Sequence, residues 1–550
     1  MKRFYSICIF LLLIGETFTG MAAEWQWSVR IPSMISQETE AHPQAFLWIP
    51  AGCKRVKAVA VGQHNMCEET LFENPVFRRR MQEAGIALVW ITPILDFPWN
   101  VNTGCNDALL TALDSLAETS GYDELKVVPI VPVGHSAMAT FPWNFAAWNP
   151  ERALAVISYH GDAPRTNLTG YGGANLEWGR TRNIDGIPGL MVEGEYEWWE
   201  ARVNPALAFR MMYPESCISF LCDTGHFDVA DRTADYIGLF LKKAVEYRIP
   251  ADTDWNKPVA LKKLNPRDGW LAERWRTGTK EPQGEVRTAR LAKQPRRAKP
   301  APYLQYKGDR HDAFWYFDRE MAELTEECYR QERDLLPQYV SFMQEGELVP
   351  YTPQSHVTLS ARFLPEADGV TFHLKAVYTD SLRASLTDGH SAAVPRIERI
   401  CGPVKQVNDT TFVLDFYRMG TTNKKRTPSI TLVASAGGDR QYKECVQELS
   451  FNIPYPLTEG RRQCILFPGI GDVKAGTESV TLDAASDYGL PVYYYVKEGP
   501  AEIRGNKVIF TQIPPRSRYP LKVTVVAWQY GIAGKVQTAE PVERTFFIVE

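Results

Sequence analysis

A serine at the end of a predicted β-strand has the surroundings of a nucleophile. Ser136 lies in the segment Val131–Met138, where an apolar strand pattern gives way to a helical one. A strand that turns sharply into a helix exposes the serine Oγ, and Gly134 lets the backbone pass close to the turn. The N-terminus of the helix adds partial positive charge where an oxyanion would develop. The segment therefore predicts a serine suited to acyl transfer.

A histidine and an acidic segment follow this serine in the chain. His226 lies in the segment Cys222–Phe227 that follows the apolar run Ile218–Leu221, and it is one of only nine histidines. The acidic segment Glu193–Glu197 ends another apolar strand pattern. A nucleophilic serine needs a base that takes its proton and a carboxylate that orients this base. The three segments hold the residue types that such chemistry requires.

These segments resemble the α/β-hydrolase family over roughly residues 25–250. The family motif is Gly-x-Ser-x-Gly, and its catalytic residues follow the order nucleophile, acid, histidine. Met138 replaces the last glycine of the motif, which leaves open how closely the helix after Ser136 packs. The resemblance implies that His226 is the general base.

The resemblance leaves two glutamates as candidates for the acid. The family's acid lies three residues after a glycine that ends a late strand, which gives Glu197 from Gly194. Glu195 is the alternative acid. For both residues, the competing interpretation is a solvated acidic loop with no catalytic role.

The oxyanion hole requires two N–H donors. By resemblance, one is the backbone N–H of Ala137, directly after the nucleophile. The other comes from the loop Gly62–Met66 after the third predicted strand, where we prefer Gln63 and place His64 second. This loop lacks the His-Gly-Gly-Gly string of many esterases.

Further residues near the predicted triad are candidate substrate contacts. His160 ends the strand after the serine, at the edge where open α/β sheets bind ligands. Trp99 follows the fourth predicted strand, and Trp198 follows the acidic segment, next to Trp199. A structural histidine and ordinary aromatic packing are the competing interpretations.

Alternating strands and helices position these residues in an α/β-hydrolase three-layer sandwich with a mainly parallel sheet over residues 24–250. The strands are nearly continuous apolar runs, as expected for a sheet that is covered on both faces. We expect strands at Trp25–Arg30, Gln44–Ile49, Val56–Val61, Ile86–Thr92, Lys126–Val133, Ala153–Tyr159, Gly189–Glu193 and Ile218–Asp223, and helices at Pro75–Ala84, Asn106–Thr119, Ala137–Trp148, Arg202–Met212 and Ala234–Tyr247.

The pattern changes after residue 250. Residues 251–350 read as a basic linker and a helical bracket, with the helix within His311–Met343. Alternating apolar residues then predict all-β sandwich domains at 351–455 and 456–550. The last of these resembles a bacterial immunoglobulin-like module in three segments, Gly489–Val492, Gly499–Ala501 and Val523–Ala527.

The N-terminus has the pattern of a secretory signal peptide over residues 1–23. Lys2 and Arg3 precede the apolar run Phe4–Ile14, and small residues follow at Gly20–Ala23. We therefore expect an exported protein, periplasmic or extracellular, with no transmembrane segment after cleavage. Without Cys8 nine cysteines remain, an odd number, so at least one is unpaired within the chain; Cys67 with Cys105 is the pair we favour.

The composition narrows the classes of function. The chain has 550 residues, 45% hydrophobic and 23% charged, as in ordinary globular proteins. The formal net charge is −4, which argues against a nucleic-acid partner. The cysteines show no zinc-ligand spacing, and we expect no metal and no cofactor. The 15 Trp and 24 Tyr residues suit protein cores and sugar-binding clefts alike.

The sequence thus predicts a secreted serine ester hydrolase. The export pattern, the aromatic residues and the appended β-modules resemble bacterial carbohydrate esterases, which implies removal of acetyl or methyl esters from plant-type polysaccharide. Two alternatives stay open: a non-catalytic glycan-binding protein on a hydrolase scaffold, and a serine peptidase.

Overall fold

The computed structural model describes residues 25–165, 176–195, 200–225, 229–275, 298–331, 335–352, 358–417 and 423–550. Its central strands are Trp27–Arg30 (β1), Gln44–Trp48 (β2), Ala58–Gln63 (β3), Ile86–Thr92 (β4), Ile130–His135 (β5), Val156–Tyr159 (β6), Pro188–Gly194 (β7) and Cys217–Asp223 (β8). They form one sheet in the order β1-β2-β4-β3-β5-β6-β7-β8. β2 is antiparallel to β1 and β4, and the neighbours from β4 to β8 are parallel. All eight predicted strands are confirmed, with ends shifted by a few residues.

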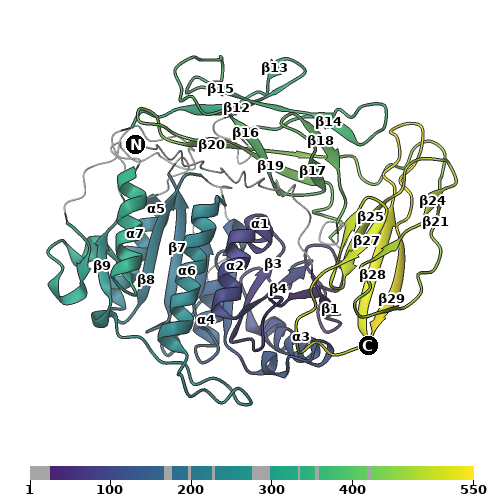
Figure 1. Cartoon of the computed structure of the whole chain (residues 1–550). Helices are drawn as coiled ribbons and strands as arrows, with labels where there is room; N and C mark the ends of the chain where they lie inside the picture. Colours follow the sequence, from purple (N-terminus) through teal and green to yellow (C-terminus); the bar gives the residue numbers. More distant parts are fainter. Residues whose placement is uncertain are drawn as a thin grey trace, which may run out of the picture.

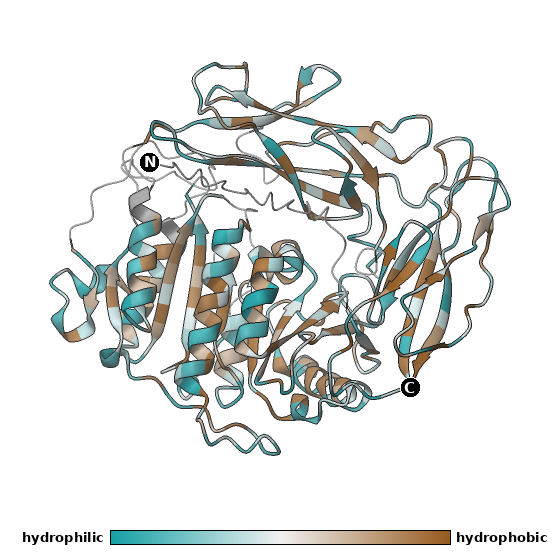
Figure 2. Cartoon of the chain, viewed as in Figure 1, coloured by the Kyte–Doolittle hydropathy of each residue, from teal (hydrophilic) through white to brown (hydrophobic). Residues whose placement is uncertain are grey.

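Helices cover both faces of this sheet (Figure 1). The predicted helices are confirmed, and the first α-helix, Cys67–Glu73, is one that the sequence did not suggest. Figure 2 shows apolar strands between helices that carry hydrophilic stripes. The helices are Cys67–Glu73 (α1), Pro75–Ala84 (α2), Cys105–Ser120 (α3), Phe141–Trp148 (α4), Glu200–Met212 (α5) and Asp231–Arg248 (α6), with short 3-10 turns at Val101–Thr103 (η1), Asp123–Lys126 (η2) and Ser136–Met138 (η3).

Local chemistry sets the ends of α2. The Asn74 side chain accepts hydrogen bonds from the N–H groups of Val76 and Phe77, at 2.8 and 3.0 Å, and Pro75 occupies the first turn. Gly85 ends the helix in a left-handed conformation. These are the usual start and stop signals of a helix.

The segment after residue 250 packs against β8 and shares the core of the central sheet. The predicted helix over His311–Met343 is only partly right, because the aromatic run within it forms a buried strand. Consecutive aromatic residues favour a strand that is covered on both faces. The elements are Pro266–Asp268 (η4), Trp270–Glu273 (β9), Ala301–Pro302 (β10), Tyr303–Gln305 (η5), Arg310–Asp312 (η6), Ala313–Tyr316 (β11) and Arg319–Gln331 (α7).

In the described residues from 335 onward, the sheets are antiparallel apart from one parallel pair of strands, β22 with β29. We call residues 335–452 the middle β-region and residues 453–550 the C-terminal β-region. The first contains Tyr339–Gln344 (β12), Glu347–Leu348 (β13), Thr371–His373 (β14), Lys375–Thr379 (β15), Arg396–Cys401 (β16), Val404–Gln406 (β17), Thr411–Leu414 (β18), Ser429–Ala436 (β19) and Cys445–Asn452 (β20). The second contains Ile465–Leu466 (β21), Val473–Lys474 (β22), Ser479–Thr481 (β23), Ala485–Ser486 (β24), Tyr493–Glu498 (β25), Ala501–Arg504 (β26), Lys507–Phe510 (β27), Leu521–Trp528 (β28) and Val542–Val549 (β29).

The two β-regions contact different sides of the α/β part (Figure 1). The middle β-region extends over the edge where the parallel strands end. The C-terminal β-region lies beside β1 and α3, where Arg516 contacts the Glu124 carboxylate at 2.8 Å and the Gly499 N–H donates to the Trp25 carbonyl. In the described ranges, no helix combines the length and apolar character needed to cross a membrane.

Candidate active site

Ser136 occupies a sharp turn between β5 and η3. Its φ is +50°, in the left-handed region that residues with a Cβ enter only at an energetic cost. The next residues form η3, and α4 begins at Phe141. Ser136 is 9% exposed. The strand, strained turn and helix predicted from the sequence are all present.

Two glycines allow the turn to close. A Cβ on Gly134 would clash with the carbonyl oxygen of Met138, and a Cβ on Gly161 would clash with the Cβ of Ala139. Gly161 follows β6, so the turn at Ser136 comes close to the end of this neighbouring strand at Ala139. Met138 is fully buried. This arrangement explains how the turn packs without the final glycine of the motif.

Both backbone polar groups of His135, the residue before the nucleophile, are bound by side chains. Its N–H donates to Glu68 Oε1 at 2.6 Å, and its carbonyl accepts from Asn65 Nδ2 at 2.7 Å. Glu68 also accepts from the Met66 N–H at 3.0 Å. Burial raises the Glu68 pKa to about 7, and its backbone donors oppose this shift. Residues 65–68 therefore hold the backbone that leads into Ser136.

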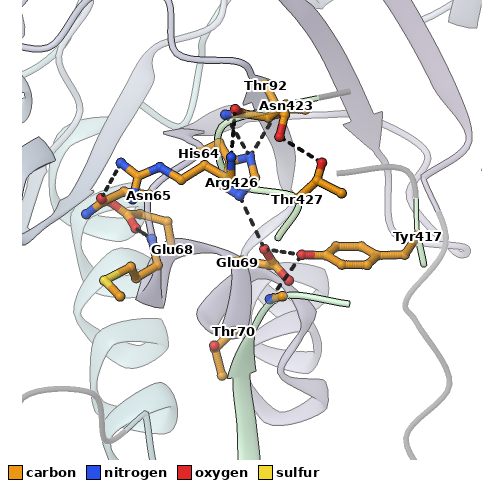
Figure 3. A network of polar contacts seen from close by, with 12 residues as sticks. His64, Asn65, Glu68, Glu69, Thr70, Thr92, Tyr417, Asn423, Arg426 and Thr427 are labelled. Carbon is orange, nitrogen blue, oxygen red and sulfur yellow. Dashed lines mark hydrogen bonds and ion pairs between the residues drawn. The ribbon is translucent and has the colours of Figure 1, made fainter. Parts of the chain in front are cut away.

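The segment that holds the turn is itself contacted by the middle β-region (Figure 3). Arg426 bridges Glu38 and Asn65, with its Nε 2.6 Å from Glu38 Oε1 and its Nη2 3.3 Å from Asn65 Oδ1. The Glu69 carboxylate pairs with Arg399 and accepts from the Tyr417 hydroxyl. Burial raises the Glu69 pKa to about 7, and Arg399 opposes this shift.

The two candidates for the second oxyanion donor, Gln63 and His64, have partners in the structure. The His64 N–H donates to the Ile91 carbonyl at 2.9 Å, so it is already used within the sheet. The Gln63 side chain bonds the backbone of Leu95 and Asp96. The His64 ring bonds Thr92 Oγ1 at 2.8 Å, and burial, followed by Arg426, lowers its pKa to about 3.

Asn65, which the sequence did not single out, offers a backbone N–H that is available as an oxyanion donor, whereas the N–H of His64 is already used. Its backbone N–H makes no hydrogen bond within the part of the chain that the structure describes, and its side chain contacts the His135 carbonyl. Ala137 lies in the first turn of η3, where N–H groups have no acceptor inside the helix. The local sequence carries no signal for this role, since Asn65 reads as an ordinary polar residue in a loop.

Of the two candidate acids, only Glu195 is among the described residues. Its Oε1 lies 2.5 Å from Lys443 Nζ of the middle β-region, and both side chains are almost fully buried. Glu197, His226 and Trp198 lie outside the described residues. The residue before His226, Gly225, is packed so closely that a Cβ would clash with Val446 of β20.

His160 and Trp99 are buried rather than exposed on a rim. His160 is 0% exposed with φ +49°, and its Nε2 lies 3.7 Å from Asp223 Oδ1. Trp99 is also 0% exposed and packs on the rings of Phe141 and Phe145. Trp99 is therefore a packing residue here, which corrects its expected role as a sugar platform.

One cysteine prediction is also wrong. Cys105 is a free, buried thiol that donates to the Asn100 carbonyl at 3.4 Å, so it forms no disulfide with Cys67. Cys105 opens α3 beneath the loop after β4, and burial raises its pKa to about 12. In the described ranges, no group of three or more His, Cys, Asp or Glu side chains has the arrangement of a metal site.

No protein-family model matches the sequence, and no curated protein does either. The structure is similar to the fluorophosphonate-binding serine hydrolase F of Staphylococcus aureus, at 12% identity and a TM-score of 0.28, over 41% of this chain and 99% of the other. An arylesterase matches at 14% identity and a TM-score of 0.30, over 42% and 88%. An esterase of the archaeon Pyrobaculum calidifontis matches at 15% identity and a TM-score of 0.29, over 40% and 85%. These values are too low to assign an activity, which has to be argued from the site itself.

Proposed function

We propose that the protein is a serine ester hydrolase with Ser136 as its nucleophile. The observation that carries this proposal is the left-handed φ of +50° at Ser136, between a strand and a helix, with Gly134 and Gly161 making room for the turn. Backbone strain of this kind persists only where the surroundings enforce it, and it is concentrated at functional sites. A serine on a sharp turn between a strand and a helix is suited to attack a carbonyl carbon.

The proposed mechanism is acyl transfer in two steps. Ser136 Oγ attacks the ester carbonyl while His226 takes its proton, and the alcohol leaves with that proton. Water then attacks the acyl-enzyme, with His226 again as the base, and the carboxylic acid is released. A glutamate, Glu197 or Glu195, orients the histidine and stabilises its charged form.

The oxyanion of each tetrahedral intermediate needs two donors. We assign one to the Ala137 N–H, as the sequence predicts. We assign the second to the Asn65 N–H, because the His64 N–H already donates to the Ile91 carbonyl and the Asn65 side chain reaches the backbone next to Ser136. Gln63 stays the alternative for this second donor.

For the substrate, we propose an ester that is attached to a polysaccharide. For the location, we propose that the protein acts after export, in the periplasm or outside the cell. The support for both is the signal-peptide pattern of residues 1–23, the richness in Trp and Tyr, and the two appended β-regions. Trp198 and Trp199 remain candidates for sugar stacking, whereas Trp99 is buried in the core.

The central experiment is labelling with a fluorescent fluorophosphonate, together with hydrolysis of 4-nitrophenyl acetate. We expect the wild type to be labelled and Ser136→Ala to lose both label and activity. The matched control is Ser158→Ala, which removes a buried serine on the adjacent strand β6 and should keep both. A folded wild type that takes no label would favour the glycan-binding protein.

A second experiment addresses the substrate. Acetylated and methyl-esterified plant polysaccharides are incubated with the wild type and with Ser136→Ala, and acetate and methanol are measured. Release that requires Ser136 supports the carbohydrate esterase. Labelling accompanied by cleavage of peptide amides alone would favour the serine peptidase.

A further inference from the structure

The middle β-region contacts the segments beside the acid and the histidine of the proposed triad, and it contacts the Asn65 loop that binds the backbone next to Ser136. Next to the nucleophile, Arg426 contacts Asn65. Next to the acid, Lys443 pairs with Glu195. Next to the histidine, the Glu444 carboxylate accepts from the Thr224 hydroxyl and pairs with Arg232. Val446 packs on Gly225. These contacts come from two short stretches, residues 423–426 and 443–446.

The contact beside the nucleophile forms a continuous chain of hydrogen bonds. Arg426 Nη2 donates to Asn65 Oδ1, and Asn65 Nδ2 donates to the His135 carbonyl at 2.7 Å. One amide side chain therefore joins the middle β-region to the residue directly before Ser136. The carbonyl end and the amino end of Asn65 are both used, so its orientation is fixed by partners on two sides.

The helix that carries Glu68 is held by the same region. Glu69 pairs with Arg399 and accepts from the Tyr417 hydroxyl, at 3.0 Å for the latter. Thr70 donates to the Ile400 carbonyl. The two side chains that bind the His135 backbone are Glu68, which accepts from its N–H at 2.6 Å, and Asn65, which donates to its carbonyl. Both belong to residues 65–70, a segment that the middle β-region contacts from the other side.

We propose that the middle β-region is part of the active site and that Arg426 is a positioning residue for Ser136, acting through Asn65. This inference rests on the proposed function. The strained turn at Ser136 needs support from its surroundings, and the hydrogen bonds to His135 provide it. Removing Arg426 releases one side of Asn65, which then loses its fixed position at the turn.

The test compares three full-length variants by kcat, KM, fluorophosphonate labelling rate and Tm. Arg426→Ala should lower kcat and the labelling rate by about 10- to 100-fold, since small displacements of a reacting group have effects of this size. KM should change less than about twofold, because the variant disturbs the turn and not the bound substrate.

Arg426→Lys guards against a simple failure to fold. A lysine keeps the charge that pairs with Glu38, but a single ammonium does not reproduce the fork that bridges Glu38 and Asn65. We expect a folded protein with a smaller loss in the same direction. A labelling rate equal to that of the wild type in both variants would overturn the proposal.

Arg516→Ala is the matched control at the other interface. Arg516 bonds the Glu124 carboxylate at 2.8 and 2.9 Å and belongs to the C-terminal β-region, away from the triad loops. We expect its kcat and labelling rate to stay within about twofold of the wild type, even where Tm falls. An equal loss in Arg516→Ala would mean that any weakened interface lowers activity, and the specific role of Arg426 would be rejected.

The outcomes separate this inference from the proposed function. If the wild type takes no label, the proposed function fails. If the wild type is labelled at Ser136 and Arg426→Ala is labelled equally fast, the function stands and the positioning role fails.

Discussion

Lys443 Nζ lies 2.5 Å from Glu195 Oε1, and the two side chains are 1% and 3% exposed. One partner belongs to the middle β-region and the other directly follows β7. A buried carboxylate that loses its cation is strongly destabilising. This ion pair gives Glu195 a role in joining the two parts of the molecule, which is separate from the orientation of a histidine.

The two candidate acids should respond differently to substitution. We expect Glu197→Gln to lower kcat on the order of 10⁴-fold with little effect on stability, as for a triad acid. Glu195→Gln removes the ion pair that Glu195 forms with the buried Lys443, which should cost about 3–5 kcal/mol of stability. Kinetics and urea unfolding measured side by side check this. A larger kcat loss in Glu195→Gln would reverse the assignment.

The packing of the turn against β6 can be tested by exchanging two residues. Gly161→Ala introduces a Cβ that clashes with the Cβ of Ala139, so we expect a clear drop in Tm and in activity. A second substitution, Ala139→Gly, removes the Cβ with which the new side chain clashes, and it should restore much of the Tm and of the activity. Thermal unfolding and 4-nitrophenyl acetate hydrolysis measure the effect. A double variant as impaired as Gly161→Ala would show that another contact is responsible.

The strain at Ser136 predicts an unusual order of stabilities. At φ +50° serine and alanine pay the same steric cost because both carry a Cβ. Glycine has no Cβ and adopts this conformation without that cost. Ser136→Gly should therefore unfold with a free energy about 1 kcal/mol higher than Ser136→Ala, and both should be inactive. At Ser158, which lies within strand β6, the glycine variant should be the less stable one. The same order at both positions would argue against strain at the turn.

Glu68 should make stability depend on pH. Its pKa is about 7 in the folded protein against an ordinary value of 4.5, because the side chain is buried. The folded state therefore binds the proton more tightly, and the stabilisation is complete below about pH 4.5 and falls as the pH rises to 7.

The measurement compares the wild type with Glu68→Gln by urea unfolding at several pH values. The stability of the wild type relative to the variant should decline between about pH 4.5 and 7. Glu347→Gln, at an exposed position in β13, is measured in parallel as the control substitution. A difference for Glu68→Gln that does not vary with pH would contradict the assignment.

The central sheet could be predicted from the sequence because its strands are buried on both faces and appear as continuous apolar runs. The sharp turn at Ser136 could be predicted because the strand, glycine and helix around it are adjacent in the chain. Helix α1 could not, since it is only seven residues long and two of its buried side chains, Glu68 and Glu69, are charged residues that a sequence pattern assigns to the surface. These carboxylates are buried by partners far along the chain, such as Arg399, 330 positions away from Glu69.

The role of Asn65 was missed for the same reason. Local sequence shows a polar residue in a loop, but the orientation of its side chain is set by His135 on one side and Arg426 on the other. The strand at Ala313–Tyr316 was mistaken for a helix because its aromatic residues also suit helical spacing. Burial against β8 decided between the two.

The contact between Arg426 and Asn65 joins positions 361 residues apart. During synthesis the whole α/β part is complete long before residue 426 is added to the chain. If the middle β-region positions the nucleophile, a nascent or truncated chain that contains the entire triad remains a poor catalyst. Activity then begins only after residue 426 has been added and the middle β-region has folded, so the order of synthesis itself delays the reaction.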